Sequence, residues 1–140
     1  MDVARKSPAV LKQARRSMIL LDTNALIWLH QGHRRSRPLA KAAARLYISP
    51  ASLLEVQFLV EAGRVGLRPG ASVSDLVDDE RWLVDEPPAA AWFLRALEVG
   101  WTRDPFDRLL VAHARVRGWQ LATGDVALSE RLGAKDSVEL

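Results

Sequence analysis

Met18-Ile19-Leu20-Leu21-Asp22 is the stretch of sequence that decides the fold. Its four consecutive apolar residues predict a strand that is buried on both faces, as in the centre of a parallel sheet. Short apolar runs recur at 46–48, 82–84 and 119–123, and segments with helical signals separate them. Strands that alternate with helices predict a three-layer α/β/α sandwich with a central, mainly parallel sheet.

Proline and serine at helix starts, and glycine at helix ends, set the bounds of the helices that we expect. Gly118, for example, ends an apolar helical segment that begins at Asp104-Pro105. The basic stretch from Gly32 to Arg37 is expected to be a loop. The predicted helices span residues 24–30, 38–45, 52–63, 72–81, 87–98 and 104–117.

The composition is that of an ordinary globular protein, with 49% hydrophobic and 26% charged residues in a chain of 140, which suits one domain. The absence of cysteine excludes disulfides and thiolate metal sites, which fits a cytoplasmic protein. No apolar run approaches the roughly 20 residues that a membrane span needs. We therefore expect no membrane partner.

The net charge of +3 depends on the first 17 residues. These hold five basic residues against Asp2 alone, so residues 18–140 carry a net charge close to zero. We expect residues 1–17 to be a flexible basic extension and Met18 to be the natural start. Overall charge is therefore weak evidence for a nucleic-acid partner.

Four acidic residues stand where ligand sites form in parallel sheets. Asp22 directly follows the first strand, and Asp125 follows the last predicted strand after one glycine. Asp104 begins a helix, and Glu55 lies one turn into the helix after the second strand. Since such sites form at the carboxyl ends of the strands, we expect the four to converge at one edge of the sheet.

Carboxylates that converge in this way suit a hard divalent cation. Like charges raise each other's pKa and oppose folding, and a bound Mg²⁺ or Mn²⁺ removes that cost. One such ion activates water, and two clamp the attacking and leaving oxygens of a phosphodiester. The pattern favours a metal-dependent enzyme that cuts a nucleic-acid backbone.

Each acid also has a structural interpretation. Asp104 and Asp107 match a capping box around Pro105, and for Asp107 capping is as good an explanation as support of a metal. An aspartate after a strand is often a helix cap, and Gly-Asp125 is a common turn pair. Glu55 is the hardest to explain structurally because it interrupts an apolar segment.

Four segments in order resemble the motifs of PIN-domain nucleases. They are Leu20-Leu-Asp-Thr-Asn-Ala-Leu-Ile-Trp28, Ser49-Pro-Ala-Ser-Leu-Leu-Glu55, Arg103-Asp-Pro-Phe-Asp-Arg-Leu-Leu-Val-Ala112 and Leu121-Ala-Thr-Gly-Asp125. The third has the form common among toxins of VapBC toxin–antitoxin pairs. Each motif alone is only suggestive, but the four together, in order and from Met18 to Leu132, are specific.

The resemblance implies one PIN-like nuclease domain over residues 18–140, a metal-dependent endoribonuclease that acts as the toxin of such a pair. It implies that four catalytic acids bind Mg²⁺ or Mn²⁺, directly or through water: Asp22, Glu55, Asp104 and Asp125. Asp107 matches an additional acid of the metal site. The polar neighbours that would orient ligands or water are Thr23, Asn24, Ser52 and Thr123.

The resemblance also implies partners: an RNA substrate, a second copy in a homodimer, and an antitoxin that covers the acidic groove in a hetero-oligomer. Leu54 stands where many relatives have tryptophan, and the usual tyrosine after the fourth motif is missing. These departures leave substrate choice and partner fit open.

Arg108 and Trp101 are the best candidates for substrate binding, because both stand beside Asp104. For the basic group Arg34, Arg35 and Arg37, a solvated surface is as good an interpretation as phosphate contact. Of the other tryptophans, Trp28, Trp92 and Trp119 lie in apolar runs and are expected in the core. The three histidines lack metal-ligand spacing and are expected to have packing or surface roles.

Two other functions remain open at this stage. A phosphatase of the haloacid-dehalogenase type also begins with an aspartate after the first strand, but it needs a second acid where this chain has Asn24. A non-catalytic RNA-binding module that keeps the PIN shape is the other alternative. The sequence does not decide which RNA is cut or whether one or two metal ions act.

Overall fold

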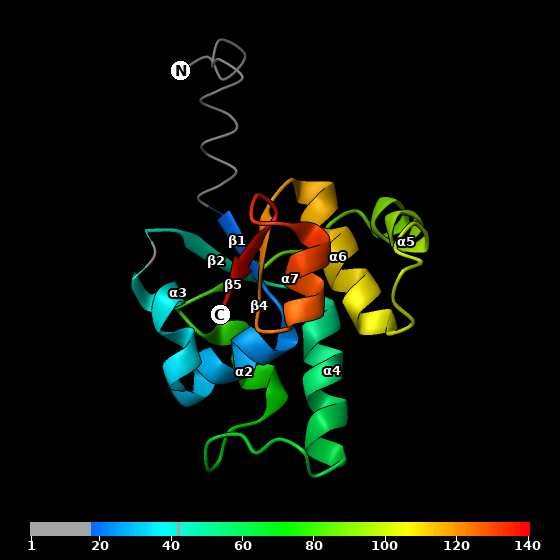
Figure 1. The fold of residues 1–140 in the computed structure, drawn as a ribbon. Helices are drawn as coiled ribbons and strands as arrows, with labels where there is room; N and C mark the ends of the chain where they lie inside the picture. Colours follow the sequence, from blue (N-terminus) through cyan, green and yellow to red (C-terminus); the bar gives the residue numbers. More distant parts are fainter. Residues whose placement is uncertain (1–17, 42) are drawn as a thin grey trace, which may run out of the picture.

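The computed structural model describes residues 18–41 and 43–140 and contains a five-stranded sheet, all of it parallel (Figure 1). The strand order is β3-β2-β1-β4-β5, so the predicted first strand lies at the centre. The predicted fold class is confirmed. The strands are β1 Met18–Leu21, β2 Arg45–Ile48, β3 Leu83–Val84, β4 Gln120–Thr123 and β5 Ser137–Glu139.

The alternation of side chains along β1 builds two cores, one on each face of the sheet. Leu20 pairs in register with Tyr47 on one side and Leu121 on the other. Leu20 packs into a core with Leu110 of the last long helix, whereas its neighbours Ile19 and Leu21 belong to a core on the opposite face. A central strand that is buried on both faces explains the unbroken apolar run.

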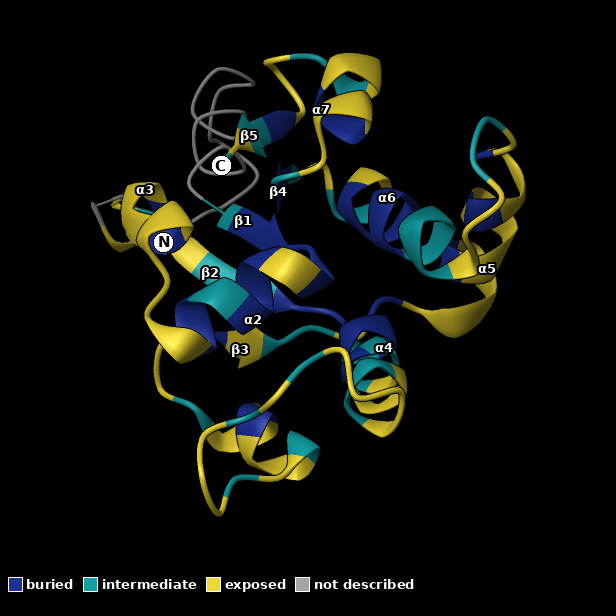
Figure 2. Ribbon diagram, turned by 60° about the horizontal axis from the view of Figure 1, so that its bottom comes forward, coloured by how far each residue is buried: buried dark blue, intermediate teal, exposed yellow. Residues whose placement is uncertain are grey.

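Helices cover both faces and give the three layers (Figure 2). The core that contains Ile19 is closed by α2, α3, α4 and the 3₁₀-helix η3, and the core that contains Leu20 is closed by α6 and α7. Helix α5 packs on α6, with Trp92 and Ala112 in their shared cluster. The helices are α2 Thr23–Gln31, η2 Arg34–Ser36, α3 Arg37–Lys41, α4 Pro50–Glu61, η3 Val73–Asp78, α5 Ala89–Leu97, α6 Pro105–Arg117 and α7 Val126–Leu132.

Three of these helices begin on acidic capping residues, and two of them, α2 and α7, directly follow strands. Asp22, Asp104 and Asp125 each accept hydrogen bonds from backbone N–H groups of the first turns of α2, α6 and α7. Gly118 ends α6 in the left-handed conformation, with φ of 72°, which costs glycine little because it has no Cβ. Helix starts therefore bring acids to the carboxyl edge of the sheet.

Several predicted bounds are wrong. The helix expected over 38–45 is α3 Arg37–Lys41, because Arg45 is extended and belongs to β2, where it pairs with Met18 of β1. The expected loop to Arg37 contains η2, and the helix expected over 72–81 is the 3₁₀-helix Val73–Asp78. Helix α7 and strand β5 were not predicted, since Ser137–Glu139 is too short to give a strand signal.

The expectation for residues 1–17 lies outside the described residues. None of the helices that the structure describes is long and apolar enough to cross a membrane.

Candidate active site

Five acids near the carboxyl edge of the sheet are close enough to affect one another's pKa values, and Asp107 is affected by the other four. Asp107 lies in the first turn of α6 and is partly buried. Its pKa is raised to about 7, first by burial and then by the charges of four other acids: Asp104, Glu55, Asp125 and Asp22. Asp107, which the sequence suggested as an additional acid, is thus the residue whose pKa is raised by all four of the others.

Asp22 is the deepest of these acids, with 5% of its surface exposed. Its pKa is raised to about 6, mainly by burial and to a smaller extent by the charge of Asp125. The hydroxyl of Thr123 and the backbone N–H of Ala25 donate to the carboxylate and oppose the increase. Asp22 therefore both caps α2 and presents a buried carboxylate to the site.

Thr123, the last residue of β4, connects two acids. Its hydroxyl donates to Asp22 and accepts from the backbone N–H of Asp125, at 3.0 Å. Thr123 is completely buried, so its rotamer is fixed by packing. Asp125 itself is exposed and caps α7 through Leu128 N, at 3.2 Å.

Glu55 projects from α4 toward the same site. Burial raises its pKa, as do the charges of Asp104 and Asp22, while a hydrogen bond from Thr23 lowers it. Thr23 is also joined to Ser52 by a buried hydrogen bond of 3.1 Å. These contacts tie the start of α2 to α4 and hold the glutamate in place. Asn24 is exposed, and its backbone N–H donates to Asp22.

Asp104 is exposed and caps α6, with Oδ1 accepting from Phe106 N at 2.8 Å and from Asp107 N at 3.2 Å. The capping interpretation and the site interpretation are therefore compatible, because a cap occupies one carboxylate oxygen. Asp104 also raises the pKa values of Glu55 and Asp107, so its charge acts on both.

The donor set fits a hard divalent cation, because every acid offers carboxylate oxygen and the cluster repels itself. Within residues 18–41 and 43–140, no three histidine, aspartate or glutamate side chains are already arranged as the ligands of one ion.

A pocket of about 300 Å³ opens beside the acids. Two acids, Asp107 and Asp125, form part of its lining, and Trp101 forms an aromatic wall. Arg108 does not line it; its Nε donates to the carbonyl of Thr102 at 2.8 Å and holds the loop before α6. The lining residues are Trp101, Thr102, Asp107, Asp125, Ala127, Leu128 and Arg131.

Sequence reasoning missed Arg131, whose guanidinium carbon lies 5.4 Å from the ring centroid of Trp101. A signal existed: Ala127 and Leu128 lie four and three residues before Arg131, which is the spacing of neighbours on one face of a helix capped by Asp125. Without recognising α7, that face could not be assigned to the site.

The other candidates lie elsewhere. Arg35 is turned against the protein, where it stacks on Trp28 and donates to the carbonyls of Gly124 and Leu140. His113 is completely buried and pairs with Asp85, while His33 caps η2. Trp92 is buried as expected, whereas Trp28 and Trp119 are only partly buried.

A comparison with protein families found that residues 19–131 match the PIN domain. The chain belongs to the PIN-domain family. This match contains all five acids and most of the sheet. A comparison with curated proteins found no match.

Solved structures of PIN-like fold were found in toxin–antitoxin complexes. A chain of a toxin–antitoxin complex from Klebsiella pneumoniae is 18% identical, with 87% of this chain and 99% of that chain covered and a TM-score of 0.63. A chain of VapBC2 from Rickettsia felis, bound to promoter DNA, is 16% identical, with 87% and 98% covered and a TM-score of 0.61. A chain of FitAB bound to DNA is 24% identical, with 88% and 94% covered and a TM-score of 0.51. At these identities the similarity is one of fold.

Proposed function

We propose that this PIN-domain protein is a metal-dependent endoribonuclease that acts as the toxin of a toxin–antitoxin pair. The observation that carries the proposal is the convergence of four acids on Asp107, each of which raises its pKa. Helix capping alone does not explain this cluster, because capping does not require like charges to lie close together. It suits a site whose charge is neutralised by Mg²⁺ or Mn²⁺.

In this proposal, Asp22, Glu55, Asp104 and Asp125 hold the cation, directly or through water, with Asp107 as the fifth acid. A bound divalent cation supplies Lewis acidity, which lowers the pKa of a water nucleophile and stabilises charge on a phosphodiester. Thr123 fixes the orientation of Asp22, and Thr23 with Ser52 fixes that of Glu55. Asn24 contributes its backbone N–H to Asp22.

Hydrolysis by water would leave a 5′-phosphate and a 3′-hydroxyl. Without a bound cation, the carboxylates would repel the phosphates of RNA and weaken its binding. Cleavage should therefore depend on the cation for binding as well as for chemistry. Arg108 is a proposed phosphate contact. Its Nε donates to the Thr102 carbonyl, so the contact would use the other guanidinium nitrogens.

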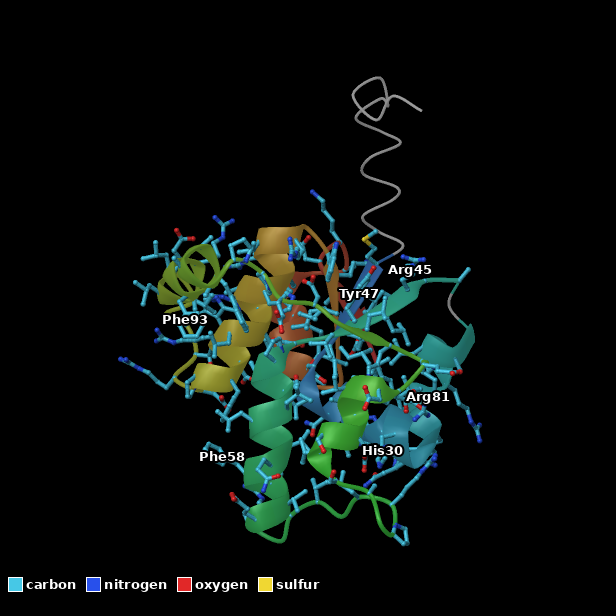
Figure 3. The ribbon with its side chains drawn as sticks, turned by 180° about the vertical axis from the view of Figure 1, so that it is seen from behind. His30, Arg45, Tyr47, Phe58, Arg81 and Phe93 are labelled. Carbon is cyan, nitrogen blue, oxygen red and sulfur yellow. The ribbon has the colours of Figure 1, made fainter. Side chains whose placement is uncertain are left out.

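Antitoxin binding is supported by the similar structures, which are of toxin–antitoxin complexes, and by exposed apolar side chains on α4 and α5. Phe58 on α4 and Phe93 on α5 are 51% and 54% exposed and lie on the same side of the molecule (Figure 3). Leu54, Leu94 and Leu97 are exposed on the same two helices. We propose that α4 and α5 contribute to the homodimer or antitoxin interface, and that the complex acts in the cytoplasm.

A cleavage assay tests the enzyme proposal. The purified protein, free of antitoxin, is incubated with single-stranded and structured RNA in Mg²⁺, in Mn²⁺ and in EDTA. We expect cleavage that requires the cation and falls by at least a hundredfold in Asp22→Asn and Asp104→Asn. Asp78→Asn, at an exposed position at the end of η3, is the matched control and should keep wild-type activity.

Binding of RNA without cleavage under every metal condition would favour the alternative, a non-catalytic RNA-binding module. Loss of activity in Asp78→Asn equal to that in Asp22→Asn would show that general loss of charge, rather than the acid cluster, controls activity.

A further inference from the structure

We propose that the pocket between Trp101 and Arg131 binds the base of one unpaired nucleotide next to the phosphodiester that is cut. This inference rests on the proposed ribonuclease function and adds a subsite to it. The pocket is named here the base pocket and consists of the seven lining residues given above.

The size and walls of the base pocket suit a nucleobase. Its volume of about 300 Å³ is at the lower end of small-molecule sites. Trp101, Ala127 and Leu128 provide apolar surface, and every base has a flat π-face that stacks on an aromatic ring. Thr102 adds a polar group on the rim, next to the tryptophan.

The position of the base pocket determines which nucleotide of the RNA it binds. Asp107 and Asp125 belong both to its lining and to the acid cluster. A base in this pocket is therefore attached to a nucleotide whose phosphate reaches the acids. The pocket is thus adjacent to the reaction and is not a remote docking site.

Arg131 explains why a nucleotide is favoured over a neutral aromatic ligand. It lies against Trp101 at 5.4 Å, within the range of a cation–π contact, but it is exposed. A base that stacks on Trp101 would take the place of the guanidinium on the ring. The displaced guanidinium would then pair with the phosphate of the same nucleotide.

The loop that carries Trp101 is held in place before any ligand binds. Arg108 Nε donates to the Thr102 carbonyl at 2.8 Å, and Asp104 N donates to Thr102 Oγ1 at 3.3 Å. These two contacts link the rim of the base pocket to the cap of α6. An ordered wall lowers the entropic cost of stacking a base on it.

A base can enter such a pocket only when it has left its stack. In a duplex both faces of each base are covered by neighbours, and extrusion costs energy. The base pocket therefore favours single-stranded loops and bulges as substrates, with one extruded base beside the cleaved bond.

Abasic RNA tests the inference. A single-stranded RNA that the wild-type protein cuts at one place is prepared with one abasic nucleotide at each position near that place. We expect one position at which loss of the base lowers kcat/KM of the wild-type protein by roughly tenfold or more. In Trp101→Ala the intact RNA should be cut more slowly, and the abasic substitution at that position should cost nothing further.

Three variants sharpen the test. Trp101→Phe keeps an aromatic face and should keep most of the sensitivity to the abasic position. Leu83→Ala, which shortens an exposed apolar side chain on β3, should leave that sensitivity unchanged. Arg131→Ala should raise KM and weaken its dependence on salt, since a phosphate contact is lost. Thermal denaturation checks that each variant is folded.

The inference is overturned if no position is sensitive, or if Trp101→Ala shows the same sensitivity as the wild-type protein. If the wild-type protein neither binds nor cuts any RNA, the proposed function fails first and this subsite fails with it. Cleavage that is equally fast in duplex and single-stranded RNA would also contradict an extruded base.

Discussion

Arg35 lies over the indole of Trp28, with its guanidinium carbon 4.2 Å from the ring centroid. The same guanidinium donates to the carbonyl of Gly124 at 3.3 Å and to that of Leu140 at 3.0 Å. Gly124 separates Thr123 from Asp125, so the stacked pair forms the support on which an acid-bearing turn rests. Arg35, for which the sequence left phosphate contact and a solvated surface equally open, therefore packs against the turn that carries Asp125.

Gly124→Ala is expected to destabilise the protein. A Cβ at this position would overlap the indole of Trp28 and lie 3.0 Å from Arg35 Nη2. The indole or the turn must move, which costs roughly 1–3 kcal/mol in the free energy of unfolding. Urea denaturation measures the change. Gly66→Ala, where a Cβ meets nothing within 4 Å, is the control, and equal losses in the two variants would contradict the close contact.

Removal of one acid from the cluster is expected to stabilise the metal-free protein. Asp107 has a pKa raised to about 7, so above that pH its charge is held among like charges at a cost. A pKa raised on folding means that the associated stability is lost as pH rises through about 7. Asp107→Asn should therefore increase stability at pH 8 by roughly 1–3 kcal/mol, reduced by solvent screening.

The measurement is urea denaturation at pH 8 and at pH 5.5 in EDTA. The gain in Asp107→Asn should be large at pH 8 and small at pH 5.5, where the wild-type carboxyl holds its proton. A variant that is less stable than the wild-type protein at pH 8 would show that Asp107 serves mainly as a structural group.

His113 gives the stability of the protein a second pH dependence, opposite in sign to that of Asp107. Burial lowers its pKa, although a hydrogen bond with Asp85 at 2.7 Å acts against the change. A histidine whose pKa is lowered on folding takes up its proton more readily when unfolded. Stability is thus present above the unfolded pKa of about 6.5 and is lost as pH falls below it.

His113→Gln should flatten this loss of stability between pH 7.5 and pH 5.5, measured by urea denaturation in each buffer. His33→Asn, at an exposed capping position, is the control and should keep the wild-type dependence. An unchanged slope in His113→Gln would mean that this histidine does not contribute to it.

Self-association is expected to depend on the exposed apolar face of α4. Phe58 contacts Phe106 edge-on, with centroids 5.7 Å apart, and half of its surface is exposed. Phe58→Glu should shift the purified protein toward monomer in sedimentation at high concentration, because a charge would be buried in the interface. Val77→Glu on η3 is the matched control. A wild-type protein that is already monomeric would remove the homodimer from the proposal.

The sequence predicted the sheet because its central strands carry short, continuous apolar runs, which are typical of strands buried on both faces. It did not predict β5, since three residues at an edge give no periodic signal. The helix expected through Arg45 was wrong because alanine content favours helix locally, whereas pairing with Met18 requires an extended chain. Tertiary contacts overrode local propensity there.

For the site, the positions of Asp22 and Asp125 followed from topology, because residues after parallel strands meet at one edge, whereas Asp104 was expected there because it begins a helix. The centrality of Asp107 could not be predicted, since it depends on which face of α6 turns toward the sheet. Arg131 was missed for the same reason, as its role depends on how α7 packs against the Trp101 loop.

The central claim is that the five carboxylates act as one cation site. Calorimetric titration of Mn²⁺ into the metal-free protein at pH 7.5 tests it most directly, with Asp22→Asn, Glu55→Gln, Asp104→Asn, Asp107→Asn and Asp125→Asn beside the wild-type protein and Asp78→Asn as control. We expect saturable binding to the wild-type protein and to the control, weakened by roughly tenfold or more in the variants of Asp22, Glu55 and Asp104. Binding that none of the five substitutions changes, or no saturable binding at all, would contradict the claim.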